Sequence, residues 1–180
     1  MDCMGAVLRG SWGSGCWCMY PRLAGEASNL GSRGRRDAMT KLARRGRAPG
    51  LLAFDGDEAV GWIAIAPRTE LKRVEASRAT PRVDEQDVWV IPCITVRPSA
   101  RGRGVALALI SAAVNYAQHH GAPAVEAYPR AGSARTKDDN AFFGTEPLFR
   151  RAGFKVIRRS VGRRLARVTM RKWLGKRSSS

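Results

Sequence analysis

Apolar and polar positions alternate in blocks along the 180-residue chain, and these blocks predict several strands and helices. Two apolar segments, 51–54 and 59–66, flank an Asp-Gly-Asp turn and predict a β-hairpin. The apolar, β-branched segment 88–96 predicts a buried strand, in which Pro92 indicates a bulge or a break in pairing. Residues 105–119 predict the strongest helix, because they are apolar around most of its first three turns.

Weaker patterns predict the remaining elements, which are helices near 2–9, 34–46 and 145–152 and strands at 125–128, 154–157 and 167–170. Two other stretches, 67–85 and 131–141, are polar and are expected to be irregular. A hairpin, then a strand–helix–strand unit, then a helix with two strands predicts an α/β fold with a sheet of mixed direction.

The length of the chain fits a single domain, which we place at 1–172, followed by a basic, serine-rich disordered tail at 173–180. No apolar run is long enough to span a bilayer, and the first residues lack the pattern of a secretory signal. Four cysteines are too few for a disulfide scaffold. We therefore expect a cytoplasmic protein with no membrane partner.

The charge of the chain is less ordinary, because 32 Lys and Arg outnumber 15 Asp and Glu and give a net charge of +17. Twelve of these cations lie between 150 and 180, where no acidic residue occurs. Such a charge attracts nucleic acid, membrane surfaces or phosphate-rich ligands, and it also keeps a protein soluble without any binding role. Both interpretations stay open at this point.

A glycine-rich turn joins the predicted strand 88–96 to the helix that follows it, and its sequence is Arg101-Gly102-Arg103-Gly104-Val105-Ala106. The N-terminus of a helix presents free N–H groups and the positive end of the helix dipole, and glycine lets a phosphate approach the backbone. The two arginines add positive charge. The turn therefore predicts a site for phosphate groups.

Three kinds of phosphate-binding loop compete for this segment. A Walker A loop needs Gly-Lys followed by Ser or Thr, which the chain lacks. A dinucleotide-binding loop needs a third Gly or Ala where this chain has Leu107, although Glu126 lies about twenty residues further on, as that fingerprint requires. The pattern Arg/Gln-x-x-Gly-x-Gly/Ala after a strand fits Arg101, Gly104 and Ala106.

With this loop, the chain resembles the GNAT acetyltransferase superfamily, which uses the pattern to hold the pyrophosphate of acetyl-CoA. The resemblance runs from about Gly50 to Met170 and includes a second family signature, LFRRAGF at 148–154. The segment CWCMY at 16–20 resembles one found in a subset of uncharacterised GNAT proteins. The resemblance implies the GNAT fold, with a mixed, mostly antiparallel sheet, helices on both faces, and a first strand that is absent or truncated here.

The resemblance also implies the parts of the site. Acetyl-CoA is the expected co-substrate, held by the backbone of Ile94, Thr95 and Val96 in a gap beside strand 125–128 and by the turn at 101–106. A backbone N–H near Cys93 or Ile94 is expected to stabilise the acetyl oxygen. The expected acceptor is a primary amine on a small molecule or a protein, and the chain is expected to be a monomer or a homodimer.

Two positions depart from the family pattern. Phe149 stands where a tyrosine often protonates the leaving thiolate, and Phe142 stands where the same signature often begins with asparagine. We expect Phe149 to contact the cofactor without serving as an acid. Tyr128 is the candidate proton donor in its place, and ordinary aromatic packing is the competing interpretation.

Glu126 is the candidate general base, because it lies in an apolar strand beside the expected gap and shares a face with Tyr128. The alternative is an ion pair with Arg101, Arg130 or another basic residue. Trp17 and Tyr20 are expected to border the acceptor pocket, or else to form a hydrophobic plug. The cysteines of this segment lack partners at zinc spacing, so no metal site is expected.

The sequence thus predicts an N-acetyltransferase of the GNAT fold. The alternative is a catalytically degenerate protein of the same fold that binds nucleic acid weakly through its basic surface.

Overall fold

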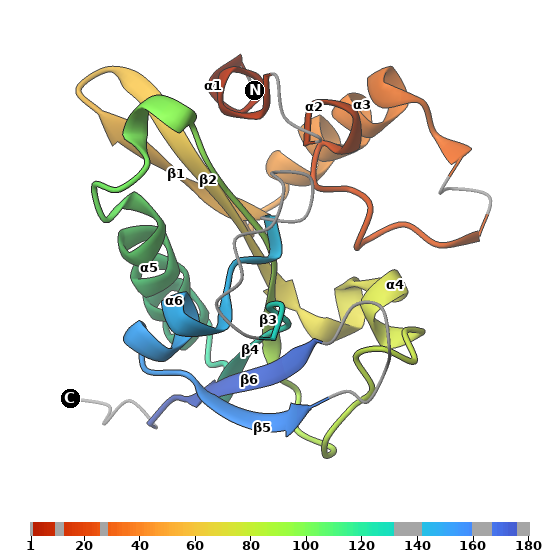
Figure 1. The fold of residues 1–180 in the computed structure, drawn as a ribbon. Helices are drawn as coiled ribbons and strands as arrows, with labels where there is room; N and C mark the ends of the chain where they lie inside the picture. The colour runs from red at the N-terminus through yellow and green to blue at the C-terminus, as the bar shows by residue number, and fades with distance from the viewer. Residues whose placement is uncertain (1, 10–12, 26–28, 132–141, 160–166, 176–180) are drawn as a thin grey trace.

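The computed structural model describes residues 2–9, 13–25, 29–131, 142–159 and 167–175 (Figure 1). Its centre is a six-stranded sheet in the order β1-β2-β3-β4-β6-β5. The strands β3 and β4 are parallel, and all other neighbouring strands are antiparallel. The mixed, mostly antiparallel sheet expected from the sequence is therefore confirmed.

The strands are β1 (Gly50–Asp55), β2 (Glu58–Pro67), β3 (Trp89–Val96), β4 (Ala124–Ala127), β5 (Lys155–Arg159) and β6 (Val168–Trp173). The α-helices are α1 (Asp2–Leu8), α2 (Gly13–Cys16), α3 (Ser32–Ala43), α4 (Lys72–Glu75), α5 (Val105–His119) and α6 (Glu146–Arg151). Two 3₁₀ helices, η2 (Arg68–Glu70) and η3 (Pro98–Ala100), complete the described elements. Within the described ranges no strand precedes β1.

Several bounds differ from those predicted. The third helix spans 32–43 rather than 34–46, and its C-cap is Arg44. Segment 67–85 contains η2 and α4 instead of being irregular throughout. Strand β6 includes Trp173, and Leu174 N donates to Pro123 O at 2.9 Å, so the expected tail boundary at 172 falls inside a paired strand. Most of the loop expected at 131–141, and the chain after 175, lie outside the described residues.

Helices cover both faces of the sheet because successive strand residues point to opposite sides. On one face, Ile63 and Ile94 belong to the core formed with α5 and α6. On the other, Trp62 and Cys93 belong to a second core formed with α1, α3 and the segment after α2. In Figure 1, α5 and α6 accordingly lie on one side of the sheet, and α1, α2 and α3 lie on the other.

Helix α5 packs closely on β2, and Gly61 makes this approach possible. A Cβ built on Gly61 would lie 2.8 Å from Leu109 Cδ1 and 3.1 Å from Val105 Cγ1. These distances are shorter than ordinary carbon contacts, so a side chain here would push the N-terminal half of α5 away from the sheet.

A buried pair of thiols joins the segment after α2 to the sheet. Cys18 Sγ donates to Cys93 Sγ at 3.2 Å, and Trp62 Nε1 donates to Cys18 Sγ at 3.1 Å. Both Trp17 and Cys18 have φ of 50°, an uncommon value for residues other than glycine. The hydrogen bonds and the packing of Cys18 between Trp62 and Cys93 hold this strained backbone in place.

Gly61→Val is expected to destabilise the fold by overpacking, at a cost of about 1–3 kcal/mol. For a protein of this size, each kcal/mol lowers the melting temperature by about 2–4 °C. Thermal unfolding followed by circular dichroism measures the change, and Gly46→Val is the matched control because a Cβ there meets nothing within 4 Å. Equal melting temperatures for the two variants would contradict the close packing of α5.

Cys18 is expected to resist alkylation in the folded protein. The hydrogen bond with Cys93, together with burial, raises the pKa of Cys18 well above its ordinary value. The thiolate is the reactive form, so a raised pKa keeps Cys18 protonated and unreactive at pH 8. Iodoacetamide followed by peptide mass spectrometry should modify the exposed Cys3 first and Cys18 much later. Denaturant should remove the difference, and rapid modification of native Cys18 would contradict this environment.

Candidate active site

The two parallel strands separate partway along their length. Strand β3 pairs with β4 only through Trp89–Ile91 in the described structure, whereas it stays paired with β2 as far as Val96. The separation begins at Pro92, which has no N–H, and the β2–β3 register shifts at the same place, between Ala64 and Ala66. The bulge or break in pairing predicted at Pro92 is confirmed, since both features occur there. The second half of β3 therefore borders a gap on its β4 side.

The backbone of β3 beyond Pro92 directs hydrogen-bonding groups into this gap. On the β2 side, Arg97 N donates to Val60 O at 2.9 Å. In an antiparallel pair, alternate residues point their N–H and C=O groups toward the same neighbour. Thr95 and Cys93 thus face β2, while Ile94 and Val96 face the gap. This alternation favours Ile94 over Cys93 as a donor inside it.

The turn after β3 ends at the N-terminus of α5. Gly102 and Gly104 have φ of 78° and 81°, in the left-handed region that favours glycine. A Cβ on either would meet nothing within 4 Å, so the outer side of the turn is open. The first bond within the helix runs from Ala108 N to Gly104 O, which leaves the N–H groups of 105–107 without acceptors inside the helix. Residues 101–106 therefore fit a phosphate group.

The two arginines of this turn are held by neighbouring groups. Arg101 Nε donates to Val96 O at 3.3 Å, so its side chain folds back toward the end of β3. Arg103 forms a 2.7 Å ion pair with Asp55 at the end of β1. Both partners of that pair are more than half exposed, and an exposed ion pair is weak enough to exchange for another anion.

A pocket of about 580 Å³ lies beside the gap, on the face of the sheet that carries α1–α3. Its floor is formed by residues of β3 and the end of β4, and its walls by the segment after α2, by α4 with the residues that follow it, and by residues before α6. The residues that line it are Cys16, Cys18, Tyr20, Pro21, Ala24, Gly25, Arg73, Val74, Ala76, Ser77, Ala79, Thr80, Pro92, Cys93, Thr95, Tyr128, Phe142, Phe143 and Arg167.

Only one of the two aromatic residues expected in this pocket borders it. Tyr20 lines the pocket, and so do the two cysteines that flank Trp17. The Trp17 ring instead packs over Gly5, its Nε1 donates to Ser32 Oγ at 3.4 Å, and the guanidinium of Arg36 lies 5.6 Å from the ring centroid. The positive φ at Trp17 thus turns its ring into the packing between α1 and α3.

Glu126 is fully buried and surrounded by donors. Arg171 donates to its Oε1 through Nε at 3.0 Å and Nη2 at 2.6 Å. Tyr128 Oη donates to Oε2 at 2.6 Å, and Arg68 Nη1 lies 3.6 Å from the same oxygen. Its ion-pair partners are therefore Arg171 and Arg68, neither Arg101 nor Arg130. Tyr128 lines the pocket, whereas Glu126 does not.

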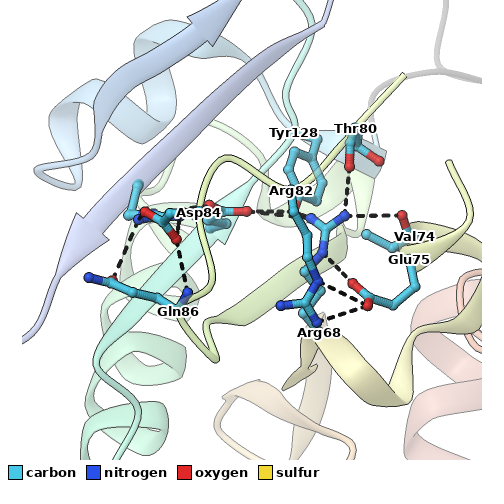
Figure 2. A network of polar contacts seen from close by, with 10 residues as sticks. Arg68, Val74, Glu75, Thr80, Arg82, Asp84, Gln86 and Tyr128 are labelled. Carbon is cyan, nitrogen blue, oxygen red and sulfur yellow. Dashed lines mark hydrogen bonds and ion pairs between the residues drawn. The ribbon is translucent and has the colours of Figure 1, made fainter. Parts of the chain in front are cut away.

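The contacts of Glu126 extend into a larger network, shown in Figure 2. Arg68 is 2% exposed and binds Glu75, the Tyr128 hydroxyl and the carbonyl oxygens of Val74 and Thr80. Arg171 also donates from Nη2 to Asp84 Oδ1 at 3.1 Å. The network therefore ties β4 and β6 to the segment that carries α4.

The electrostatics of the network have clear directions. Burial, followed by the charge of Glu126, raises the pKa of Tyr128 far above its usual range. A hydrogen bond from Arg171 lowers the pKa of Asp84. Burial alone would raise the pKa of Glu75, but hydrogen bonds from Arg82 and Arg68 outweigh it and lower that pKa. Asp84 and Glu75 are thus held ionised and Tyr128 is held protonated.

The two phenylalanines that depart from the family pattern lie in different places. Phe149 is completely buried in the core and packs edge-to-face on Phe154, with ring centroids 5.1 Å apart. It does not line the pocket. Phe142 does line it, and its ring lies 4.1 Å from that of Phe143.

Several cations of the basic C-terminal stretch are paired with acidic residues from elsewhere in the chain. Arg150 and Arg159 both bind Glu146, at 2.8 and 3.0 Å, and Arg171 belongs to the buried network. Arg163 and Arg164 lie outside the described residues. Nucleic-acid binding, the oligomeric state and the cytoplasmic location stay predictions.

The described part of the chain has neither a cluster of metal-ligating side chains nor a membrane-spanning helix. No three side chains among its His, Cys, Asp and Glu residues are grouped to hold a metal ion. None of its helices is both long enough and apolar enough to cross a membrane.

The residues that segment 67–85 contributes to the site could not be predicted from the sequence. Arg68 is the hub of the network, and Arg73 and Thr80 line the pocket. This segment has no regular hydrophobic period, and its arginines look like ordinary surface cations. The sequence gives one weak sign of the network, because acidic residues are interspersed with these arginines and this pattern suggests local ion pairs.

Comparison with known proteins agrees with this arrangement. Residues 18–141 match the sequence pattern of the acetyltransferase (GNAT) family. No curated protein sequence matches the chain. Among solved structures, the chain is similar to yncA of Salmonella typhimurium, which is named as a candidate acetyltransferase and was determined with acetyl-CoA. The TM-score is 0.58 and the sequence identity is 14%, and the alignment covers 99% of this chain and 91% of that one.

Two other structures show the same fold. A ribosomal-protein-alanine N-acetyltransferase from Brucella melitensis has a TM-score of 0.53 and 21% identity, with 81% of this chain and 80% of that one covered. An N-acetyltransferase from Staphylococcus aureus Mu50 has a TM-score of 0.52 and 18% identity, with 77% and 75% covered. Because the family pattern matches more than half of the sequence, the chain belongs to the acetyltransferase (GNAT) family.

Proposed function

We propose that the chain is an N-acetyltransferase that uses acetyl-CoA as donor and an amine as acceptor. The observation that carries this proposal is the gap that opens at Pro92, because it has an exposed helix N-terminus at one end and a pocket beside it. Donor and acceptor sites that meet at one gap are what a direct transfer reaction requires.

The donor half uses backbone groups almost entirely. The free N–H groups at the start of α5 bind the pyrophosphate, and the glycines at 102 and 104 leave room for it. The C=O group of Ile94 and the N–H group of Val96 bind the pantetheine arm in the gap. Acetyl-CoA supplies the activated acetyl group, and the Ile94 N–H donates to the acetyl oxygen as that oxygen gains negative charge.

The acceptor half is the 580 Å³ pocket, from which a neutral amine reaches the acetyl carbon. A carbon–nitrogen bond forms, the carbon–sulfur bond breaks, and the amine gives up a proton to solvent. Tyr128 borders the pocket, but its raised pKa makes it a poor proton donor to a thiolate, whose own thiol has a pKa of about 8.5. We propose that the thiolate leaves without a side-chain acid.

Glu126 acts in this proposal as a positioning residue. Both of its oxygens already accept hydrogen bonds, and Tyr128 stands between it and the pocket. A carboxylate in these contacts would have to give up a bond before it could accept an amine proton. The ion-pair interpretation is therefore the one that the contacts support.

Gly104→Asp is expected to abolish acetyl-CoA binding, because it adds bulk and negative charge where the pyrophosphate would lie. Calorimetry measures the affinity, and release of free CoA measures turnover. Gly121→Asp is the matched control, since Gly121 also has a positive φ and open space around it but lies beyond the other end of α5. Unchanged affinity in folded Gly104→Asp would remove the donor site from this turn.

Glu126→Gln separates the two interpretations of this carboxylate. We expect the variant to lose about 1–3 kcal/mol of stability, because the neutral amide binds Arg171 and Arg68 less well and leaves Asp84 and Glu75 as their anionic partners. Turnover per folded molecule should stay within about tenfold, as measured at a temperature where both proteins are folded. If Glu126 were a general base, the variant would keep its stability and its turnover would fall about 10²–10⁴-fold. The lost turnover would then be partly recovered at high pH, where more of the amine is already neutral.

A further inference from the structure

The charged side chains that line the acceptor pocket are all positive. They are Arg73 from α4 and Arg167, which directly precedes β6, and no carboxylate of the described residues lines the pocket with them. The remaining lining groups are mainly apolar or aromatic, with the hydroxyls of Ser77, Thr80 and Thr95 among them. The pocket thus combines an apolar surface with fixed positive charge.

Arg73 is held in place without a carboxylate. Its Nε donates to Tyr20 O at 3.2 Å, and its guanidinium carbon lies 4.1 Å from the centroid of the Tyr20 ring. The acidic residues nearest in sequence are used by other arginines, since Glu70 binds Arg47 and Glu75 binds Arg68. The charge of Arg73 is therefore not cancelled locally within the described structure.

Arg167 is fixed at the opposite wall. Its Nη1 donates to Tyr128 O at 3.0 Å, and its guanidinium carbon lies 3.5 Å from the centroid of the Phe143 ring. Because Tyr128 follows directly after β4, this places the second cation beside the gap between β3 and β4. Burial and the nearby charge of Arg130 lower the pKa of Arg167.

We propose that the acceptor of this pocket is a small amine that carries an anionic group, a carboxylate or a phosphate, which Arg73 and Arg167 bind while the amine points into the gap. This proposal rests on the proposed function, because it names the substrate class of the same site. A guanidinium presents paired N–H donors that fit both kinds of oxyanion. Polyamines and other polycationic amines are excluded as good substrates by like charge.

The proposal also fits the chemistry of transfer. The amine must be neutral to attack, and fixed positive charge nearby favours the neutral form of an amine. The anionic group supplies the binding energy at a distance from the reacting nitrogen and orients it. The nitrogen–carbon bond then forms, CoA leaves as the thiolate, and the amine proton passes to solvent.

The test uses two matched pairs of acceptors, L-phenylalanine with L-phenylalanine amide and phosphoethanolamine with ethanolamine. The rate of CoA release gives kcat/KM for each acceptor, and this value is divided by the fraction of the amine that is neutral at the pH of the assay. We expect the anionic member of at least one pair to be preferred by about tenfold or more, as one charge-assisted hydrogen bond provides. The pair that shows the preference distinguishes a carboxylate from a phosphate.

Three variants of the full chain locate the effect. Arg73→Ala should remove most of the preference through a higher KM, and Arg73→Lys should keep part of it. Arg78→Ala removes the same charge from the same segment but does not line the pocket, so it should leave the preference unchanged. Equal kcat/KM for anionic and neutral acceptors, or a preference that Arg73→Ala leaves intact, would overturn the proposal.

A binding measurement without turnover separates this proposal from the proposed function. Calorimetry with CoA present compares N-acetyl-L-phenylalanine and N-acetylphosphoethanolamine with N-acetyl-L-phenylalanine amide and N-acetylethanolamine. Tighter binding of an anionic compound that depends on Arg73, in a protein that transfers no acetyl group, would support the ligand class and refute the transferase. Acetyl transfer to neutral amines, together with equal binding of anionic and neutral compounds, would support the transferase and refute the ligand class.

Discussion

The separation of β3 and β4 at Pro92 is the constraint on which the rest of the site depends. A parallel pair of strands normally continues its hydrogen bonds to the end, and proline cannot donate to such a ladder. Once pairing stops, Ile94 and Val96 have backbone groups with no strand opposite them. Buried backbone groups need partners, so the groups that β4 leaves unpaired, apart from the Val96 carbonyl held by Arg101, are suited to bind a ligand along β3.

The buried network around Glu126 keeps this opening in shape. Glu126 is a carboxylate in the otherwise apolar strand β4, and its buried charge is balanced by the ion pairs with Arg171 and Arg68. Arg68 also bonds to the backbone of the segment that carries α4. The same charges that bury Glu126 therefore position α4, and α4 brings Arg73 to the pocket wall.

Much of the fold could be predicted from the sequence because its signals are local. The hairpin around the Asp-Gly-Asp turn, helix 105–119 and the disturbance at Pro92 each depend on a few neighbouring residues. The phosphate-binding role expected of the turn before α5 is a prediction of the same local kind, from the spacing of Arg101, Gly104 and Ala106. The preference for Ile94 over Cys93 as the backbone donor depends on which residues of β3 direct their N–H groups away from β2. That depends on the β2–β3 register, which no local sequence pattern contains.

The pocket could be predicted only in part, because its walls come from distant segments. Tyr20 was expected there and lines it, whereas the Trp17 side chain points away because of the positive φ at this residue. A tryptophan does not favour a positive φ, so the sequence gives no sign of this backbone conformation. Phe149 is a core residue, since the short helix α6 places it against Phe154. Arg73 and Arg167 approach the pocket from segments more than ninety residues apart, so no motif connects them.

The central claim is that the gap beyond Pro92 holds the donor, and a crystal structure of the protein with acetyl-CoA tests it most directly. The account predicts that the pantetheine arm lies between β3 and β4 and bonds to the backbone of Ile94 and Val96. It also predicts the pyrophosphate at residues 101–106 and the acetyl carbon facing the pocket that contains Arg73. Acetyl-CoA bound away from β3, or strands β3 and β4 closed against each other beyond Pro92, would contradict the account.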